Sequence, residues 1–206
     1  MVELGPSAHA RANNTDIGTN MHTVRKVLPH EYRKYRTHLK ALDADSKYLR
    51  FGSLVTDEVI DNLCNSIEED QDHHILFCVE GDDLEFLAIG HIALATEMEL
   101  AFSVLKPHQG HGIGNALMRR CIQWCRTHGI LHGTMICLST NEAIRHLCKK
   151  NGMKMRRDHG EILSEFDFDY AGIDTFIAEA TDQNLAVLDW VTKRANKLFK
   201  TTIHLV

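Results

Sequence analysis

Two periods of hydrophobic positions divide the chain. Short apolar runs bounded by turn residues predict β-strands over residues 23–28, 74–79, 86–94, 98–104, 134–138, 153–155 and 162–168. Apolar positions three or four residues apart predict helices over residues 30–42, 56–68, 112–128 and 141–150. One strand, two helices, three strands and then alternating helices and strands predict an α+β fold built on a single sheet.

The strand over residues 98–104 is expected to present two different faces, because successive side chains point to opposite sides of a sheet. One face carries apolar Met98, Leu100, Phe102 and Val104. The other carries Glu97, Glu99, Ala101 and Ser103. Two carboxylates on one face make this strand a candidate for acid–base chemistry.

Both ends of the chain lie outside this α+β pattern. Residues 1–20 lack periodicity and a basic-then-apolar signal, so a flexible leader is expected there, followed by one domain over residues 21–169. Residues 170–206 form an extension, in which apolar residues between 172 and 200 predict an amphipathic helix with one polar break at Asn184. Its apolar side packs either on its own domain or on a second copy in a homodimer.

Length and composition bound the class of protein. A chain of 206 residues with 44% hydrophobic and 25% charged residues is typical of one soluble globular core. Its net charge of −5 does not suggest a nucleic-acid partner, and it fits a positively charged acceptor only weakly. No apolar stretch approaches the ~20 residues needed to cross a bilayer, so no membrane partner is expected.

The six cysteines form no Cys-x-x-Cys pair, and most lie within apolar runs. Buried free thiols are therefore expected, and these indicate a cytoplasmic protein. The 14 histidines are scattered, and the neighbours His73 and His74 would point to opposite faces of a strand. No metal site is expected.

A glycine-rich segment follows the strand over residues 98–104 and precedes a predicted helix. We call it the glycine loop, and it reads Gln109-Gly110-His111-Gly112-Ile113-Gly114. Glycines let the backbone approach a ligand closely, and the free N–H groups of a helix N-terminus suit a phosphate. A P-loop would need Gly-Lys-Ser/Thr, and a dinucleotide fingerprint would need glycine where Asn115 stands.

The glycine loop resembles motif A of the GNAT superfamily, the GCN5-related N-acetyltransferases, which reads [Gln/Arg]-x-x-Gly-x-[Gly/Ala]. A second signature of this family, Asn at a helix start and Gly-[Phe/Met] eleven residues later, is matched by Asn141 and Gly152-Met153. The resemblance covers about residues 21–168. It implies the GNAT fold, a mixed and mostly antiparallel sheet with a splayed central strand pair and helices on both faces.

The resemblance also implies acetyl-CoA as the co-substrate. The backbone of Ser103, Val104 and Leu105 would run beside the pantetheine arm, which the splay admits. The glycine loop with Asn115 would hold the pyrophosphate, and Asn141 would reach the pantetheine arm. Asn141 also suits a helix N-cap, a role compatible with the first.

An amine attacks a thioester only in its neutral form, so a base must take a proton. In the family this base is often a glutamate on the strand before motif A, a position that Glu99 occupies; Glu97 could substitute. Either carboxylate could equally be a surface group. A backbone N–H of Val104 or Leu105 would stabilise the oxyanion.

A general acid would protonate the coenzyme A thiolate as it leaves. Many relatives have tyrosine seven residues after the motif asparagine, where this chain has Cys148. Cys148 is a weak candidate for that acid, and a buried packing role suits a cysteine in this position as well. Coenzyme A is a good leaving group and can depart without a dedicated acid.

The segment Leu42-x-x-Asp45-x-x-x-Leu49-Arg50-Phe51 resembles a pattern in a bacterial branch of the same family. It lies between the first two predicted helices and is expected to be a loop bordering the acceptor pocket. Asp45 would meet an ammonium and Arg50 a carboxylate, or the two would pair with each other and stiffen the loop.

The expected function is transfer of the acetyl group from acetyl-CoA to a primary amine, by direct attack in a ternary complex. A small-molecule amine is the first expectation for the acceptor. Two alternatives stay open: a GNAT-fold module that senses acyl-CoA without turnover, and a protein N-acetyltransferase.

Overall fold

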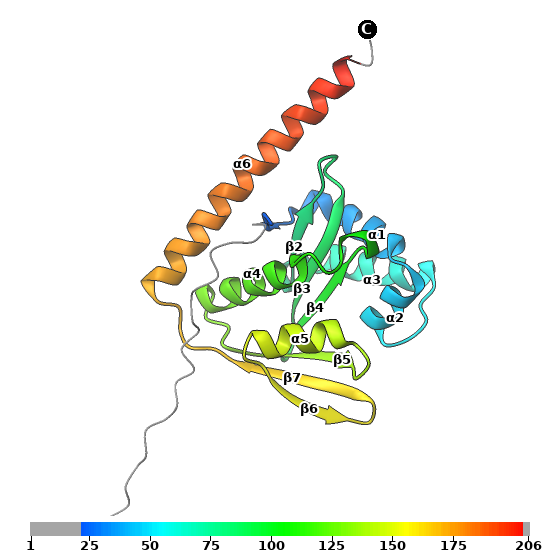
Figure 1. Cartoon of the computed structure of the whole chain (residues 1–206), viewed down its shortest axis with the longest axis vertical. Coiled ribbons are helices and arrows are strands. Elements are labelled where there is room, and N and C mark those ends of the chain that lie inside the picture. The colour runs from blue at the N-terminus through cyan, green and yellow to red at the C-terminus, as the bar shows by residue number, and fades with distance from the viewer. Residues whose placement is uncertain (1–21, 204–206) are drawn as a thin grey trace, which may run out of the picture.

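The computed structural model describes residues 22–203, and its strands form one seven-stranded sheet in the order β1-β2-β3-β4-β5-β7-β6 (Figure 1). The strands are β1 Arg25–Lys26, β2 His74–Glu80, β3 Phe86–Leu94, β4 Met98–Val104, β5 His132–Leu138, β6 Lys154–Asp158 and β7 Glu161–Asp167. Neighbouring strands pair antiparallel except β4 and β5, which run parallel. The predicted mixed, mostly antiparallel sheet is confirmed.

Six α-helices accompany the sheet within residues 22–203. They are α1 Tyr32–Ala41, α2 Ala44–Phe51, α3 Asp57–Glu69, α4 Ile113–Thr127, α5 Glu142–Lys150 and α6 Ile173–Ile203. Single 3₁₀ turns lie at η1 Pro29–Glu31, η2 Gln71–His73 and η3 Lys106–His108. The leader predicted over residues 1–20 lies outside the described residues, as do residues 204–206 at the end of the extension.

The sequence pattern predicts each strand and helix to within a few residues, with one exception. The segment between α1 and α3, expected to be a loop, forms α2. The Asp43 carboxylate caps this helix by accepting a hydrogen bond from the Ser46 N–H at 3.2 Å, and Gly52 ends it with a φ of 70°. Only eight residues long, α2 is too short to show a clear helical period.

Each face of the sheet carries its own hydrophobic core. On one face, α1 and α3 pack against β2 and β3 through fully buried side chains such as Leu39 and Ile60. On the other, α4 packs against β2, β3 and β4 through Leu117 and Cys121. The predicted placement of helices on both faces is therefore confirmed.

All six cysteines are buried free thiols, as the sequence predicts. Burial raises the pKa of several of them, including Cys137 to about 11, so these thiols stay protonated near neutral pH. Within residues 22–203, no helix is both long and apolar enough to cross a membrane.

A buried ion cluster holds the two-residue edge strand β1 on the sheet. The Arg25 guanidinium donates to the Glu31 carboxylate at 2.7 Å and, through Nε, to the Glu80 carboxylate at 2.8 Å. Burial acts to raise the pKa of Glu31, but the hydrogen bonds and charge of Arg25 lower it to about 2. Arg25 thus joins β1, the turn η1 and β2 in one charged network.

Leu117→Ala should lower the free energy of unfolding by about 2–5 kcal/mol, because it leaves a cavity between α4 and the sheet. The matched change Leu54→Ala removes a side chain that is 87% exposed and should shift stability by less than about 0.5 kcal/mol. Denaturant titration of both variants measures the difference. Equal losses would contradict this assignment of the core.

Candidate active site

The parallel strands β4 and β5 diverge at the centre of the sheet. They pair at a single register position, where Glu99 lies opposite Thr134, while β4 stays paired with β3 up to Val104. Toward their C-terminal ends the two strands therefore leave a gap between edges that would otherwise be hydrogen-bonded. The predicted splayed central pair is confirmed.

The backbone of β4 presents N–H groups to this gap. The Leu105 N–H donates to the Leu87 carbonyl at 2.9 Å, so it points toward β3. Successive backbone groups of a strand point to opposite edges, and those of Phe102 and Val104 therefore point toward β5. Of the two N–H groups expected to stabilise an oxyanion, Val104 faces the gap and Leu105 does not. Phe102, which sequence reasoning missed, joins Val104.

The glycine loop lies at the C-terminal end of β4 and leads into α4. Gly110 and Gly112 have φ angles of 79° and 82°, a left-handed conformation that favours glycine, and Gly112 is the N-cap of α4. A Cβ atom added at either glycine meets nothing within 4 Å. Both residues are exposed, so the loop offers open space beside the free N–H groups of a helix N-terminus. A pyrophosphate fits these features.

Gly114 differs from the other two glycines, because it lies where α4 packs closely against a side chain of α5. A Cβ atom at Gly114 would lie 3.1 Å from Leu147 Cδ1, so the Leu147 side chain would have to move by a few tenths of an ångström to admit it. At the C-terminal end of α5, one turn after Leu147, the Asn151 Nδ2 donates a hydrogen bond to the Asn115 Oδ1 of α4 at 3.4 Å. This hydrogen bond joins the same two helices. Asn115, expected to help hold the pyrophosphate, is thus engaged with α5.

The Gln109 side chain connects the glycine loop to two other elements. Its amide donates to the Val104 carbonyl at 3.0 Å and to the Ser46 hydroxyl of α2 at 3.1 Å. The end of β4, the loop and α2 are therefore held in one arrangement. Ser46 belongs to no recognised motif, and no signal in the sequence identifies it as a partner of Gln109.

Asn141 caps α5, where its Oδ1 accepts a hydrogen bond from the Ile144 N–H at 3.2 Å. The capping role predicted from sequence is confirmed, and Asn141 is only 7% exposed. Asn141 follows β5, the other strand of the divergent pair, and therefore lies near the gap. Its contact with a pantetheine arm stays a prediction.

The two candidate carboxylates are both exposed. Glu97 precedes β4, and Glu99 lies within it. Glu99 shares its face with Ser103, whose hydroxyl contacts His38 of α1, so Glu99 points to the sheet face that α1 and α2 border. It stands where β4 and β5 begin to diverge, and Glu97 lies just outside that point.

A buried polar group beside Ser103 was missed by sequence reasoning. His38 is 2% exposed; its Nδ1 donates to the Phe86 carbonyl at 2.8 Å, and its Nε2 accepts from the Ser103 hydroxyl at 2.9 Å. Burial lowers the pKa of His38 to about 4, and the nearby Arg50 charge acts in the same direction. A neutral imidazole therefore holds the Ser103 side chain. The spacing of Tyr35, His38, Leu39 and Leu42 places His38 on the apolar face of α1, a signal that could have identified it as buried.

A second buried histidine lies on β3. His91 is 6% exposed, and its Nε2 lies 2.9 Å from the Nδ1 of His74. Burial, with the charges of Arg50 and His74, lowers the pKa of His91 to about 3. Tyr35 packs edge-on against the His91 ring, with centroids 6.0 Å apart.

Asp45 and Arg50, which are expected to contact the acceptor, both lie on α2, but only Asp45 is exposed. Asp45 is exposed in the first turn. Arg50, in the last turn, donates to the Tyr35 hydroxyl at 3.5 Å and stacks on Phe51. Among residues 22–203 no ion pair joins Asp45 to Arg50, so the second of the two alternatives, an internal pair, is not formed.

Cys148 lies in the core between α5 and the sheet and is fully buried. Burial raises the pKa of its thiol. Its place on the α4 and α5 side of the sheet, opposite to the face of Glu99, supports a packing role. Its use as an acid remains the weaker expectation.

A parallel pair that diverges beside a glycine loop at a helix N-terminus is an arrangement suited to a phosphate-bearing ligand. Residues 37–153, more than half of the chain, match the family described as Acetyltransferase (GNAT) family. The chain belongs to this family.

Individual relatives agree with that assignment. The chain is 29% identical over 170 residues to Acetyltransferase Pat of Mycolicibacterium smegmatis. The aligned residues make up 78% of this chain and 50% of the relative, so the chain spans about half of that protein's length. The structure of the GNAT domain of S. lividans PAT superposes with a TM-score of 0.59 at 22% identity, covering 70% of this chain and 89% of that one.

A third relative was solved with a ligand. The PaiA N-acetyltransferase of Thermoplasma acidophilum, in complex with coenzyme A, superposes with a TM-score of 0.53 at 14% identity and covers 70% of this chain and 98% of its own. At this identity the likeness concerns the fold alone.

The buried histidines should make stability depend on pH. The pKa of His38 is about 4 in the folded chain and about 6.5 when unfolded, so the unfolded chain takes up the proton first as pH falls. Stability is fully present above about pH 6.5 and is lost as pH falls toward 4, by about 3 kcal/mol.

In His38→Gln the free energy of unfolding should fall less steeply between pH 6.5 and 4, as measured by urea titration at several pH values. The control His146→Gln changes an exposed residue of α5 and should keep the wild-type slope. A wild-type slope in His38→Gln would contradict the buried, neutral state of His38.

Proposed function

We propose that this chain transfers the acetyl group of acetyl-CoA to an amine. The observation that carries the proposal is the divergence of β4 and β5 beside the glycine loop. An extended pantetheine arm fits the gap, where the N–H groups of Phe102 and Val104 are directed, and the open space at Gly110 and Gly112 fits the pyrophosphate. Membership of the acetyltransferase family supports the same activity.

The residues around the gap have complementary tasks. Acetyl-CoA supplies an activated thioester carbonyl. The carboxylate of Glu99 takes a proton from the acceptor ammonium, directly or through water, so that the neutral amine attacks. The N–H groups of Phe102 and Val104 stabilise the negative charge that develops on the carbonyl oxygen. The C–S bond then breaks, and coenzyme A leaves as a thiolate that takes up the proton lost by the nitrogen of the new amide.

Attack by the acceptor is direct. A covalent route would need an accessible nucleophile, but the Ser103 hydroxyl is buried and donates to His38. Cys148 is buried on the opposite face of the sheet from Glu99. Acetyl-CoA and the amine therefore bind together in a ternary complex.

The open surface around Glu99 favours an amine carried on a polypeptide. Glu99 is exposed, and Ile136 on the same face of β5 is 57% exposed, although it is a large hydrophobic residue. β6 and β7 extend this open surface, where Arg156 and Glu165 are exposed. A small amine, the first expectation from sequence, is usually enclosed on most of its surface. Asp45, exposed at the start of α2, is available to a cationic acceptor segment.

Glu99→Gln should lower kcat about 10²–10⁴-fold while the Kd for acetyl-CoA changes little, because the amide cannot accept the proton. Release of free thiol, measured with lysine peptides and with small free amines, gives the rates; calorimetry gives the Kd. Glu97→Gln is the matched control and should keep activity within a few-fold. Tight acetyl-CoA binding without turnover of any amine would replace this proposal with a sensor of acyl-CoA.

Gly112→Ala should raise the Kd for acetyl-CoA about tenfold or more, because an alanine, for which a φ of 82° costs about 1–2 kcal/mol, shifts the free loop away from the conformation that binds and adds a methyl group where the pyrophosphate binds. Gly129→Ala is the control, since Gly129 has a φ of 73° and equally open space but follows the far end of α4. Its Kd should match the wild type. Equal Kd values for both variants would contradict the assignment of the glycine loop.

A further inference from the structure

The long C-terminal helix α6 faces its own domain with polar side chains. The Arg120 guanidinium of α4 donates to Glu179 at 3.1 Å and to Gln183 at 3.2 Å. Further along, Lys193 and Lys197 donate to backbone carbonyls of the β2–β3 hairpin at 3.0 and 2.7 Å. Ala186 is the one buried hydrophobic residue of α6 in the described chain. The helix is therefore held mainly by polar contacts, which include the Arg120–Glu179 ion pair.

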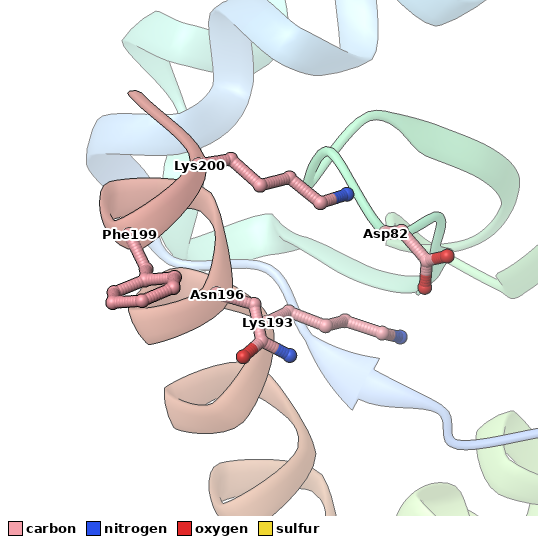
Figure 2. Close-up of a pocket in the computed structure, with 5 residues that line it drawn as sticks. All are labelled: Asp82, Lys193, Asn196, Phe199 and Lys200. Carbon is pink, nitrogen blue, oxygen red and sulfur yellow. The ribbon is translucent and has the colours of Figure 1, made fainter. Parts of the chain in front are cut away.

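A pocket between α6 and this hairpin has the same polar character. Figure 2 shows Lys193 and Lys200 extending from α6 toward the turn that carries Asp82. Its volume of about 260 Å³ is below the roughly 300–1,000 Å³ of small-molecule sites. The pocket thus belongs to the attachment of α6 rather than to the acceptor.

The apolar side of α6 points away from the domain. We call it the outer stripe, and it consists of Ile173, Ile177, Ala180, Val187, Val191 and Leu198. Ile173 is 80%, Ile177 62% and Leu198 63% exposed. Steps of four and three residues run from Ile173 to Val191 through Asn184, and Arg194 is a second polar position before Leu198. This is the seven-residue repeat of a helix that pairs with another helix. A lone surface helix would place this stripe against its own core.

The charges of α6 indicate what covers the outer stripe. The first half, residues 173–188, contains Asp174, Glu179 and Asp182 and no Lys or Arg, a net charge of −3. The second half, residues 189–203, has a net charge of +3 from Lys193, Arg194, Lys197, Lys200 and Asp189. Glu179, Lys193 and Lys197 contact the chain's own domain. Asp174 in the first half and Arg194 in the second are exposed, and two copies of α6 laid antiparallel bring these opposite charges together. The same arrangement in parallel brings like charges together.

We propose that the outer stripe pairs with the outer stripe of a second copy of this chain, antiparallel and centred on Asn184. The carboxamide of Asn184 both donates and accepts, so it satisfies its symmetry mate across a twofold axis. In this register Ile177 lies opposite Val191, seven residues to either side of Asn184. Asp174 lies opposite Arg194, ten residues to either side.

A membrane surface is the less favoured occupant, because the net charges of −3 and +3 on the two halves of α6 cancel and give the helix no net attraction to anionic lipids. It remains an outcome of the test. The proposal is independent of the acetyltransferase activity, so acetyl-CoA binding serves as a measure of folding.

Ile177→Lys/Val191→Lys should convert a dimer into a monomer. Light scattering on the full chain at micromolar concentration should give twice the 23.4 kDa chain mass for wild type and once that mass for the variant. Leu54→Lys adds charge at an exposed leucine outside α6 and should stay dimeric. Circular dichroism and acetyl-CoA affinity verify that both variants fold. A monomeric wild type, or vesicles of phosphatidylserine that bind wild type but not the α6 variant, would overturn the proposal.

Cysteine cross-linking tests the register, because all six native cysteines are buried. Under mild oxidation Asn184→Cys should form a covalent dimer. Ile173→Cys alone should not, whereas Ile173→Cys mixed with Ala195→Cys should, since these positions lie eleven residues to either side of Asn184. Cross-linking by Ile173→Cys alone would indicate parallel helices and overturn the antiparallel arrangement.

Discussion

The divergence of β4 and β5 is the constraint on which the rest of the site depends. Two parallel strands at the centre of a sheet normally satisfy each other's backbone groups, and here they pair only where Glu99 lies opposite Thr134. The N–H groups beyond that point are directed into a gap. An unpaired strand edge is a ready binding site for an extended chain, and the pantetheine arm of acetyl-CoA is such a chain.

The gap keeps its shape because each of its borders is tied to a different part of the fold. β4 remains paired with β3, and Ser103 is held from α1 by a histidine that burial keeps neutral. Gln109 joins the end of β4 to α2. Asn141 caps α5 after β5, and Gly114 allows α4 to approach α5. Stability and binding geometry therefore rest on the same contacts.

The elements that sequence reasoning found are those with strong local signals. The glycine loop is marked by three glycines within five residues, and the N-cap by Asn141 followed by Glu142. The strand over residues 98–104 has a clear two-residue period. Helix α2 was missed because eight residues span only about two turns. The hydrogen bond between His38 and Ser103 joins residues 65 positions apart, and no local pattern encodes it. For α6 the amphipathic period was visible, but only the structure shows that its polar side faces the domain.

Amide hydrogen exchange during an acetyl-CoA titration tests the central claim most directly, because it reports on the backbone groups themselves. We expect slower exchange at Phe102, Val104 and residues 110–114 as acetyl-CoA saturates the protein, with little change in α3. Saturable binding that leaves the exchange of these amides unchanged would contradict that claim.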